Sequence, residues 1–195
     1  MLTLCIDTAY KYLTCALIKD GQIISSFSSE CFKKQSEEVF NALDEVFKQA
    51  NADKRSIDSI CISEGPGSYT GVRIAMTIAK VMGELLPCDV YKISTLRLYA
   101  ANRPHCMVIM DARASRVYCG IYDKSEVIME DQAVEIKDLD IGDYTIVGDG
   151  SLVGKENDWG DIPEAFLNTR YLWEKVGNIS ALTPKYLKES ETYYR

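Results

Sequence analysis

The start of the chain alternates between apolar runs and short polar turns, which predicts β-strands joined by tight connections. Strands are expected over residues 2–7, 12–19 and 22–29. The dipeptide Asp20-Gly21 separates the last two, and this pair favours a two-residue hairpin turn. The chain is therefore expected to open with an antiparallel meander of three strands.

Between residues 35 and 50 the spacing of apolar residues changes to the helical period. The apolar side chains that fall within about 120° of one another on a helical wheel are Val39, Phe40, Leu43, Val46, Phe47 and Ala50. Ser36 is expected to cap the start of this helix, and Asn51 suits its end. The helix is expected to bury this apolar side against the meander.

Four further elements are expected before residue 102: a buried strand over residues 59–63, a helix over 70–86, a strand over 89–93 and a helix over 95–101. A meander followed by alternating helices and strands is the order of an RNase H-like lobe, the unit that is duplicated in actin-like proteins. The predicted fold class is therefore α/β, an actin-like (ASKHA) fold of two RNase H-like lobes with mixed sheets.

The best candidate for a domain boundary is Asn102-Arg103-Pro104, because a second β-rich block begins after it. We expect an N-terminal lobe over residues 1–102 and a smaller lobe over 103–195. Within the smaller lobe, the expected elements are strands over residues 106–110, 116–122, 127–136 and 144–147, and a short helix over 169–176.

The second long helix has two apolar surfaces, since its polar residues occupy a stripe of only about 60°. One surface is a line of bulky side chains: Ile74, Ile78, Val81 and Leu85. The other is a line of smaller and methionine side chains: Val72, Ala75, Met76, Ala79, Met82 and Gly83. We expect the bulky line to pack on the sheet of its own lobe and the smaller line to face a partner protein.

The first helix is expected to join this partner-binding surface through Val39, Phe40, Leu43 and Phe47. Two adjacent helices of this kind offer half of a four-helix bundle to another subunit. The alternative is that the first helix or the second lobe covers the smaller line within the monomer.

The formal charge is −7 and the isoelectric point is near 4.9, and the sequence has no block of Lys and Arg. Proteins that bind nucleic acid by themselves concentrate basic residues on one face. Tight tRNA binding by this chain alone is therefore not expected.

Seven cysteines lie singly, with no C-x-x-C pair, which favours a reduced, cytoplasmic environment. The N-terminus has no basic region ahead of its apolar residues and reaches Asp7 too early for a signal peptide. No apolar run is long enough to suggest a membrane span.

The loop Gly65-Pro66-Gly67-Ser68-Tyr69-Thr70-Gly71 leads from a buried strand into the second helix, where backbone N–H groups can bind an anion. It lacks the lysine of a P-loop and the spacing of a dinucleotide site. The alternative, which we prefer, is a tight turn in which the glycines allow positive φ and Ser68 or Thr70 caps the helix.

Other polar residues give weak signals for chemistry. Asp7 ends a strand and could lie near a metal ion, but an aspartate there more often caps a turn. The single histidine, His105, precedes Cys106 in a strand, so their side chains point to opposite faces and a catalytic dyad or a zinc site is not expected. Asp111 and Arg113 lie in a hairpin loop, where they could bind a partner or pair with each other.

Several of these landmarks together resemble the TsaB family, formerly called YeaZ. They are Asp7-Thr8 after the first strand, Gln35-Ser36-Glu37, Gly65 to Ile74 (GPGSYTGVRI, with Arg73), Met110 to Arg113, Val117-Tyr118 and Pro184 to Lys188. The GPGSYTGVRI block is the specific one, and the match spans nearly the whole chain. The sequence departs from the family at Gln35, where histidine is common, at Arg116, where an acidic residue is frequent, and in a shorter segment between Gly150 and Pro184.

The resemblance implies a non-catalytic scaffold subunit for N6-threonylcarbamoyladenosine modification of tRNA next to the anticodon. It implies pairing through the two N-terminal helices with the catalytic subunit TsaD, which acts with the ATPase TsaE. No metal and no cofactor of its own is implied, ATP would bind only at the level of the complex, and tRNA would be contacted only through the complex. Two rival functions remain open: a peptidase-like or ATP-hydrolysing enzyme, and a protein that forms a homodimer through the same helices.

Overall fold

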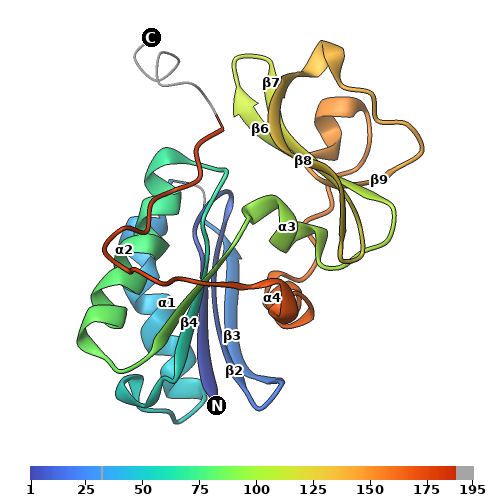
Figure 1. Ribbon diagram of the computed structural model, residues 1–195. Coiled ribbons are helices and arrows are strands. Elements are labelled where there is room, and N and C mark those ends of the chain that lie inside the picture. Colours follow the sequence, from blue (N-terminus) through green and yellow to red (C-terminus); the bar gives the residue numbers. More distant parts are fainter. Residues whose placement is uncertain (32, 188–195) are drawn as a thin grey trace.

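The computed structural model describes residues 1–31 and 33–187 and contains two mixed β-sheets (Figure 1). The first sheet has the strand order β10-β5-β4-β1-β2-β3. Its strands are β1 (Leu2–Asp7), β2 (Tyr12–Lys19), β3 (Gln22–Glu30), β4 (Ser59–Ser63), β5 (Asp89–Ile93) and β10 (Glu174–Lys175). Strands β1, β4 and β5 run parallel, and the others are antiparallel to their neighbours.

Helices lie on both faces of the first sheet. Helices α1 (Gln35–Gln49) and α2 (Tyr69–Leu85) cover one face, and α3 (Thr95–Ala100) and α4 (Ile162–Asn168) lie on the other (Figure 1). Strand β1 is buried along its whole length because its alternate side chains enter two different cores. Leu4 packs in the core under α1 and α2, while Cys5 packs in the core that α3 and α4 share.

The second sheet has the strand order β8-β7-β6-β9. Its strands are β6 (Cys106–Arg113), β7 (Arg116–Asp123), β8 (Glu126–Glu135) and β9 (Thr145–Gly148). The strand β9 pairs in parallel with β6, and the other pairings are antiparallel. A separate apolar cluster around Ile109 and Cys119 packs on one face of this sheet.

Most elements of the N-terminal part form where the sequence pattern predicts them. The hairpin at Asp20-Gly21 has positive φ at both residues, +51° and +80°, as its sequence favours. The predicted cap at Ser36 is wrong: α1 starts at Gln35, and its N-cap residue, Lys34, makes no side-chain hydrogen bond. The Gln35 side chain is buried and donates a hydrogen bond to the carbonyl of Tyr10 at 2.7 Å, which ties the helix start to the β1–β2 connection.

The predicted helix over residues 169–176 is also wrong. A 3₁₀ turn at Arg170–Leu172 is followed there by β10, which pairs with β5 of the first sheet, and the helix is α4, earlier in the chain. The carboxylate of Asp161 caps α4 by accepting from the N–H of Glu164 at 2.9 Å. After the second sheet the chain therefore returns to the first one, since α4 lies against it and β10 is its edge strand. The last residues of the predicted smaller lobe, 188–195, lie outside the described part of the chain.

None of the helices within the described ranges is long and apolar enough to cross a membrane.

Candidate partner-binding surface

The loop Gly65 to Gly71, the motif loop, leads into α2 and packs closely on the β1–β2 connection. Two of its glycines therefore cannot carry a side chain. A Cβ atom on Gly67 would lie 2.3 Å from the carbonyl oxygen of Ala9, and one on Gly71 would lie 2.2 Å from that of Thr8. The N–H of Ser68 donates to the Ala9 carbonyl at 2.7 Å. These contacts bring the start of α2 directly onto the end of β1.

Thr8 fixes α2 further through its buried hydroxyl group. The hydroxyl donates to the carbonyl of Gly71 at 2.6 Å and accepts from the N–H of Ala75 at 3.1 Å. Gly71 and Ala75 are four residues apart, so the hydroxyl joins the two groups that an α-helix normally bonds to each other. The first turn of α2 is thereby attached to the sheet.

The same geometry confirms the tight-turn interpretation of the motif loop. Ser68 is the N-cap residue, and its hydroxyl accepts from the N–H of Gly71 at 3.3 Å. Gly65 has a φ of +105°, and its N–H donates to the hydroxyl of Thr95 at 3.1 Å. Three N–H groups of the loop, those of Gly65, Ser68 and Gly71, thus already have partners within the protein.

Asp7 caps a turn, as its position after a strand favours. Its carboxylate is fully buried and accepts from the N–H of Ala9 at 2.9 Å, from the hydroxyl of Tyr99 at 2.7 Å and from the hydroxyl of Ser63. Burial raises the pKa of Asp7, and the three hydrogen bonds oppose that shift. Among the described residues, no group of three or more His, Cys, Asp or Glu side chains converges as a metal site.

The raised pKa of Asp7 predicts a pH-dependent difference in stability between the protein and the variant Asp7→Asn. The folded state holds this proton more tightly than the unfolded state, so the carboxyl's contribution to stability is present below about pH 4 and is lost as pH rises through the folded pKa. Asparagine cannot ionise, so the variant should gain stability relative to the parent as pH rises from about 4 through the folded pKa of Asp7. Urea unfolding at several pH values measures this, and a difference that stays constant with pH would contradict the assigned direction.

A buried polar network joins the first sheet to the second. The carboxylate of Asp149, just after β9, accepts from the hydroxyl of Tyr10 and the ammonium of Lys11 and, at 2.9 Å, from the N–H of Asp111. The ring of Trp159 packs beside it, 5.4 Å from the ring of Tyr10 between centroids. Side chains of the protein itself thus occupy this part of the junction.

The loop residues Asp111 and Arg113 were expected either to bind a partner or to pair with each other. The carboxylate of Asp111 accepts from the backbone N–H of Arg113 at 2.7 Å, so it caps its own loop. The side chain of Arg113 is exposed, and within residues 1–31 and 33–187 no ion pair links the two side chains. A role in partner binding stays a prediction.

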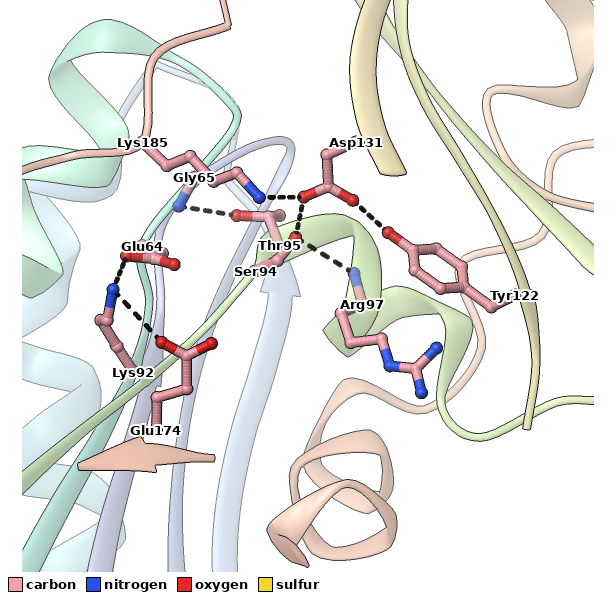
Figure 2. Close-up of polar contacts among 10 residues, drawn as sticks. All are labelled: Glu64, Gly65, Lys92, Ser94, Thr95, Arg97, Tyr122, Asp131, Glu174 and Lys185. Carbon is pink, nitrogen blue, oxygen red and sulfur yellow. Dashed lines mark hydrogen bonds and ion pairs between the residues drawn. The ribbon is translucent and has the colours of Figure 1, made fainter. Parts of the chain in front are cut away.

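A second polar cluster lies between the carboxyl end of β5 and strand β8 (Figure 2). Asp131 of β8 accepts from the hydroxyl of Ser94, from the hydroxyl of Tyr122 and, at 2.9 Å, from the ammonium of Lys185. Next to it, the ammonium of Lys92 lies 2.8 Å from the carboxylate of Glu64, the residue that leads into the motif loop. The two sheets and the segment around Lys185 are held together here.

The structure contradicts the prediction that the smaller line of α2 faces a partner. Four members of that line, Val72, Ala75, Met76 and Ala79, are buried in the core on the first sheet. They cannot present their side chains to a partner. At Gly71 a side chain is excluded, because Gly71 and Thr8 hold the start of the helix close to β1. Met82 and Gly83 lie at the edge of this core, where a Cβ on Gly83 would meet Val90 and Ile179 at 2.7 and 2.9 Å.

The bulky line of α2, predicted to face the sheet, does so only in part. Ile78 is buried in the core and Ile74 packs against it, while Ile78 and Val81 also line an open apolar groove between α1 and α2. The groove has a volume of about 340 Å³. Its apolar lining consists of Phe40, Leu43, Phe47, Ile78, Val81 and Met82. Phe40 is 65% exposed, Val81 52% and Leu85, one turn further along α2, 77%. Large apolar side chains gathered in one exposed place mark a protein-binding surface.

Of the predicted partner-binding residues in α1, Phe40, Leu43 and Phe47 line this groove, but only Phe40 is exposed. Leu43 and Phe47 are buried in the core, as Val39 is. The signal for the correct face of α2 was present in the sequence, since its bulky residues recur at helical spacing, but both surfaces were apolar. Sequence reasoning gave no role to Lys11 and Asp149, which are scattered polar positions without a motif of their own, and used Thr8 only as a family landmark.

Comparison with known proteins identifies the family. A model of the TsaD family, described as tRNA N6-adenosine threonylcarbamoyltransferase, matches residues 29–143, more than half of the chain. The "tRNA threonylcarbamoyladenosine biosynthesis protein TsaB" of Bacillus subtilis is 32% identical over 148 residues. The chain belongs to the TsaB (YeaZ) branch of this family. The alignment covers 74% of the chain but only 64% of the Bacillus protein.

Two solved structures share the fold of this TsaB-family chain over nearly its whole length. One is an uncharacterized protein from Pseudomonas aeruginosa "with similarity to peptidase YEAZ", with a TM-score of 0.84, 18% identity, and coverage of 96% of this chain and 99% of that one. The other is YeaZ from Pseudomonas aeruginosa, with a TM-score of 0.79, 20% identity, and coverage of 95% and 99%. The predicted α/β fold with mixed sheets and the resemblance to the TsaB family are confirmed.

Proposed function

We propose that this chain acts in tRNA threonylcarbamoyladenosine biosynthesis as a non-catalytic subunit that docks onto a TsaD-type protein through the groove between α1 and α2. The observation that carries the proposal is the groove itself, where Phe40 and Val81 expose apolar side chains on two adjacent helices. The names of the curated relatives and the TsaD description of the matching family model support the pathway.

The proposal leaves catalysis to the partner because the candidate nucleophiles lack an activating environment. Burial raises the pKa of the Cys106 thiol to about 11, so it carries no thiolate at neutral pH. His105, the single histidine of the sequence, lies beside Asp143 at 2.9 Å on the exposed surface, away from that thiol's buried face. In this proposal a TsaE-type ATPase, ATP and tRNA reach the chain only at the level of the complex.

The test of the pathway is depletion of the protein in its own cells, followed by mass spectrometry of the tRNA nucleosides. The modified nucleoside N6-threonylcarbamoyladenosine should fall several-fold, and re-expression of the chain should restore it. An unchanged level of the nucleoside would overturn the assignment. Peptidase or ATPase activity of the purified chain alone, lost on Ser68→Ala, would favour the enzyme alternative instead.

A further inference from the structure

One row of exposed side chains runs obliquely over the solvent face of α2. Its members, four residues apart, are Tyr69, Arg73, Thr77, Val81 and Leu85, and all five are exposed. Residues at this spacing form a continuous ridge on a helix. Thr77 and Val81 border the apolar groove, so the same ridge leads from the groove to an aromatic and cationic group at the start of α2.

The guanidinium of Arg73 is held in place at this end of the ridge. It lies 3.8 Å from the centroid of the Tyr69 ring, and its Nε donates to the hydroxyl of Tyr186 at 3.0 Å. The two tyrosine rings stack on each other, with centroids 5.7 Å apart and planes 18° apart. The contacts of Arg73 thus come from the start of α2 and from a segment more than a hundred residues away in sequence.

The segment that carries Tyr186 is itself attached to the motif loop. The N–H of Lys185 donates to the carbonyl of Glu64 at 2.8 Å, and a Cβ on Gly65 would lie 2.7 Å from the carbonyl oxygen of Lys185. The ammonium of Lys185 binds Asp131 of the second sheet. Arg73 is therefore positioned before any partner arrives, which lowers the conformational entropy lost on binding.

Among residues 1–31 and 33–187, Arg73 has no acidic partner. In the part of the chain that the structure describes, no carboxylate forms an ion pair with it, although the sequence carries 29 acidic residues. The other cation facing the same segment, Lys80, donates to the carbonyl of Ser180 at 3.1 Å. A stacked guanidinium is suited to bind a carboxylate with two parallel hydrogen bonds, and Arg and Tyr are enriched among the residues that dominate interfaces.

We propose that Arg73 binds a carboxylate of the protein that fills the α1/α2 groove, and so determines which partner binds and in which direction it lies. This inference rests on the proposed docking function and specifies its partner. The partner would carry an apolar segment for the groove and an acidic residue ~12 Å from that segment along the axis of α2, the rise over the eight residues between Val81 and Arg73. A protein carboxylate is favoured over a nucleic-acid phosphate because the ridge continues into an apolar groove and the chain has a net charge of −7.

The test compares the variants Arg73→Lys and Arg73→Met in the full chain, with the TsaD-type protein of the same genome as the binding probe. Lysine keeps the charge but loses the planar pair of donors, and methionine loses both. Each variant should therefore raise the dissociation constant about tenfold or more. The parent's affinity should fall with salt more steeply than that of Arg73→Met. Far-UV circular dichroism checks folding, and Lys155→Met, an exposed cation of the second lobe, serves as the matched control with unchanged affinity.

Three outcomes overturn the inference. The first is an affinity of Arg73→Lys equal to that of the parent protein. The second is an unchanged salt dependence in Arg73→Met. The third is loss of tRNA binding by the isolated chain with unchanged affinity for the protein probe, which would assign a phosphate to this position. If Val81→Glu also leaves binding intact, the docking function itself fails; if Val81→Glu abolishes binding and Arg73→Lys does not weaken it, only the role of Arg73 fails.

Discussion

Replacing Val81 with glutamate should lower the affinity of this chain for a TsaD-type protein at least about 100-fold, while the monomer keeps its fold. Val81 is 52% exposed and borders the groove, so a glutamate there meets water in the monomer but must be desolvated in a complex. Burying an unpaired carboxylate costs several kcal/mol, and about 2.8 kcal/mol already accounts for a factor of 100. Isothermal titration calorimetry with the purified proteins measures the affinity, and thermal unfolding checks the fold.

Two matched variants separate docking from folding. Ile128→Glu changes an equally exposed side chain, 54%, on β8 outside the groove, and should bind like the parent. Ala79→Glu changes a residue of α2 that is fully buried on the sheet, and should unfold the protein rather than weaken docking. Full-strength binding by Val81→Glu, or a well-folded Ala79→Glu that has lost binding, would show that the partner uses the other face of α2.

Replacing Gly71 with alanine should destabilise the protein by about 3 kcal/mol or prevent folding. Helix propensity alone argues for the opposite result, since alanine in a helix is favoured over glycine by up to about 1 kcal/mol. The new Cβ, however, would lie 2.2 Å from the carbonyl oxygen of Thr8, and a backbone atom cannot move aside as a flexible side chain can. Overpacking of this kind costs about 1–3 kcal/mol or more, so the steric term dominates.

The matched control for Gly71→Ala is Gly177→Ala. Apart from its chain neighbours, no heavy atom of the described residues lies within 4 Å of the position where a Cβ on Gly177 would sit. This substitution should therefore change the free energy of unfolding by less than about 0.5 kcal/mol. Urea unfolding monitored by far-UV circular dichroism compares the two variants with the parent. Equal stability of Gly71→Ala and the parent would mean that α2 sits further from β1 than described.

The docking surface illustrates how a correct periodicity can lead to the wrong orientation. The sequence separated the apolar residues of α2 into a bulky line and a smaller line. In the structure Ile78 of the bulky line joins the smaller line in the core, and Val81 and Leu85 are exposed. How much of each line is buried depends on the distance between α2 and the sheet. That distance is set by Gly71 and the hydroxyl of Thr8, which is far away in sequence, so helical spacing alone could not decide it.

The elements of the C-terminal part of the chain could not be predicted from the pattern of apolar and polar residues. Strand β10 has only two residues, and its pairing with β5 depends on backbone hydrogen bonds that any residue can make. The polar network of Asp149, Tyr10 and Lys11 joins residues from both sheets, and no spacing along the chain connects them. The position of Tyr186 beside Arg73 likewise arises only when the chain returns to α2.

The sequence by itself determined the strands of the opening meander, the two long helices, the tight entry to α2 and membership of the TsaB family, because each depends on residues that are close in sequence or form a contiguous motif. Tertiary structure alone decided which face of α2 is exposed, where the chain's last described elements pack, and which residues meet Arg73. These depend on how closely distant segments approach one another, and that distance is a property of the packed chain rather than of any local pattern.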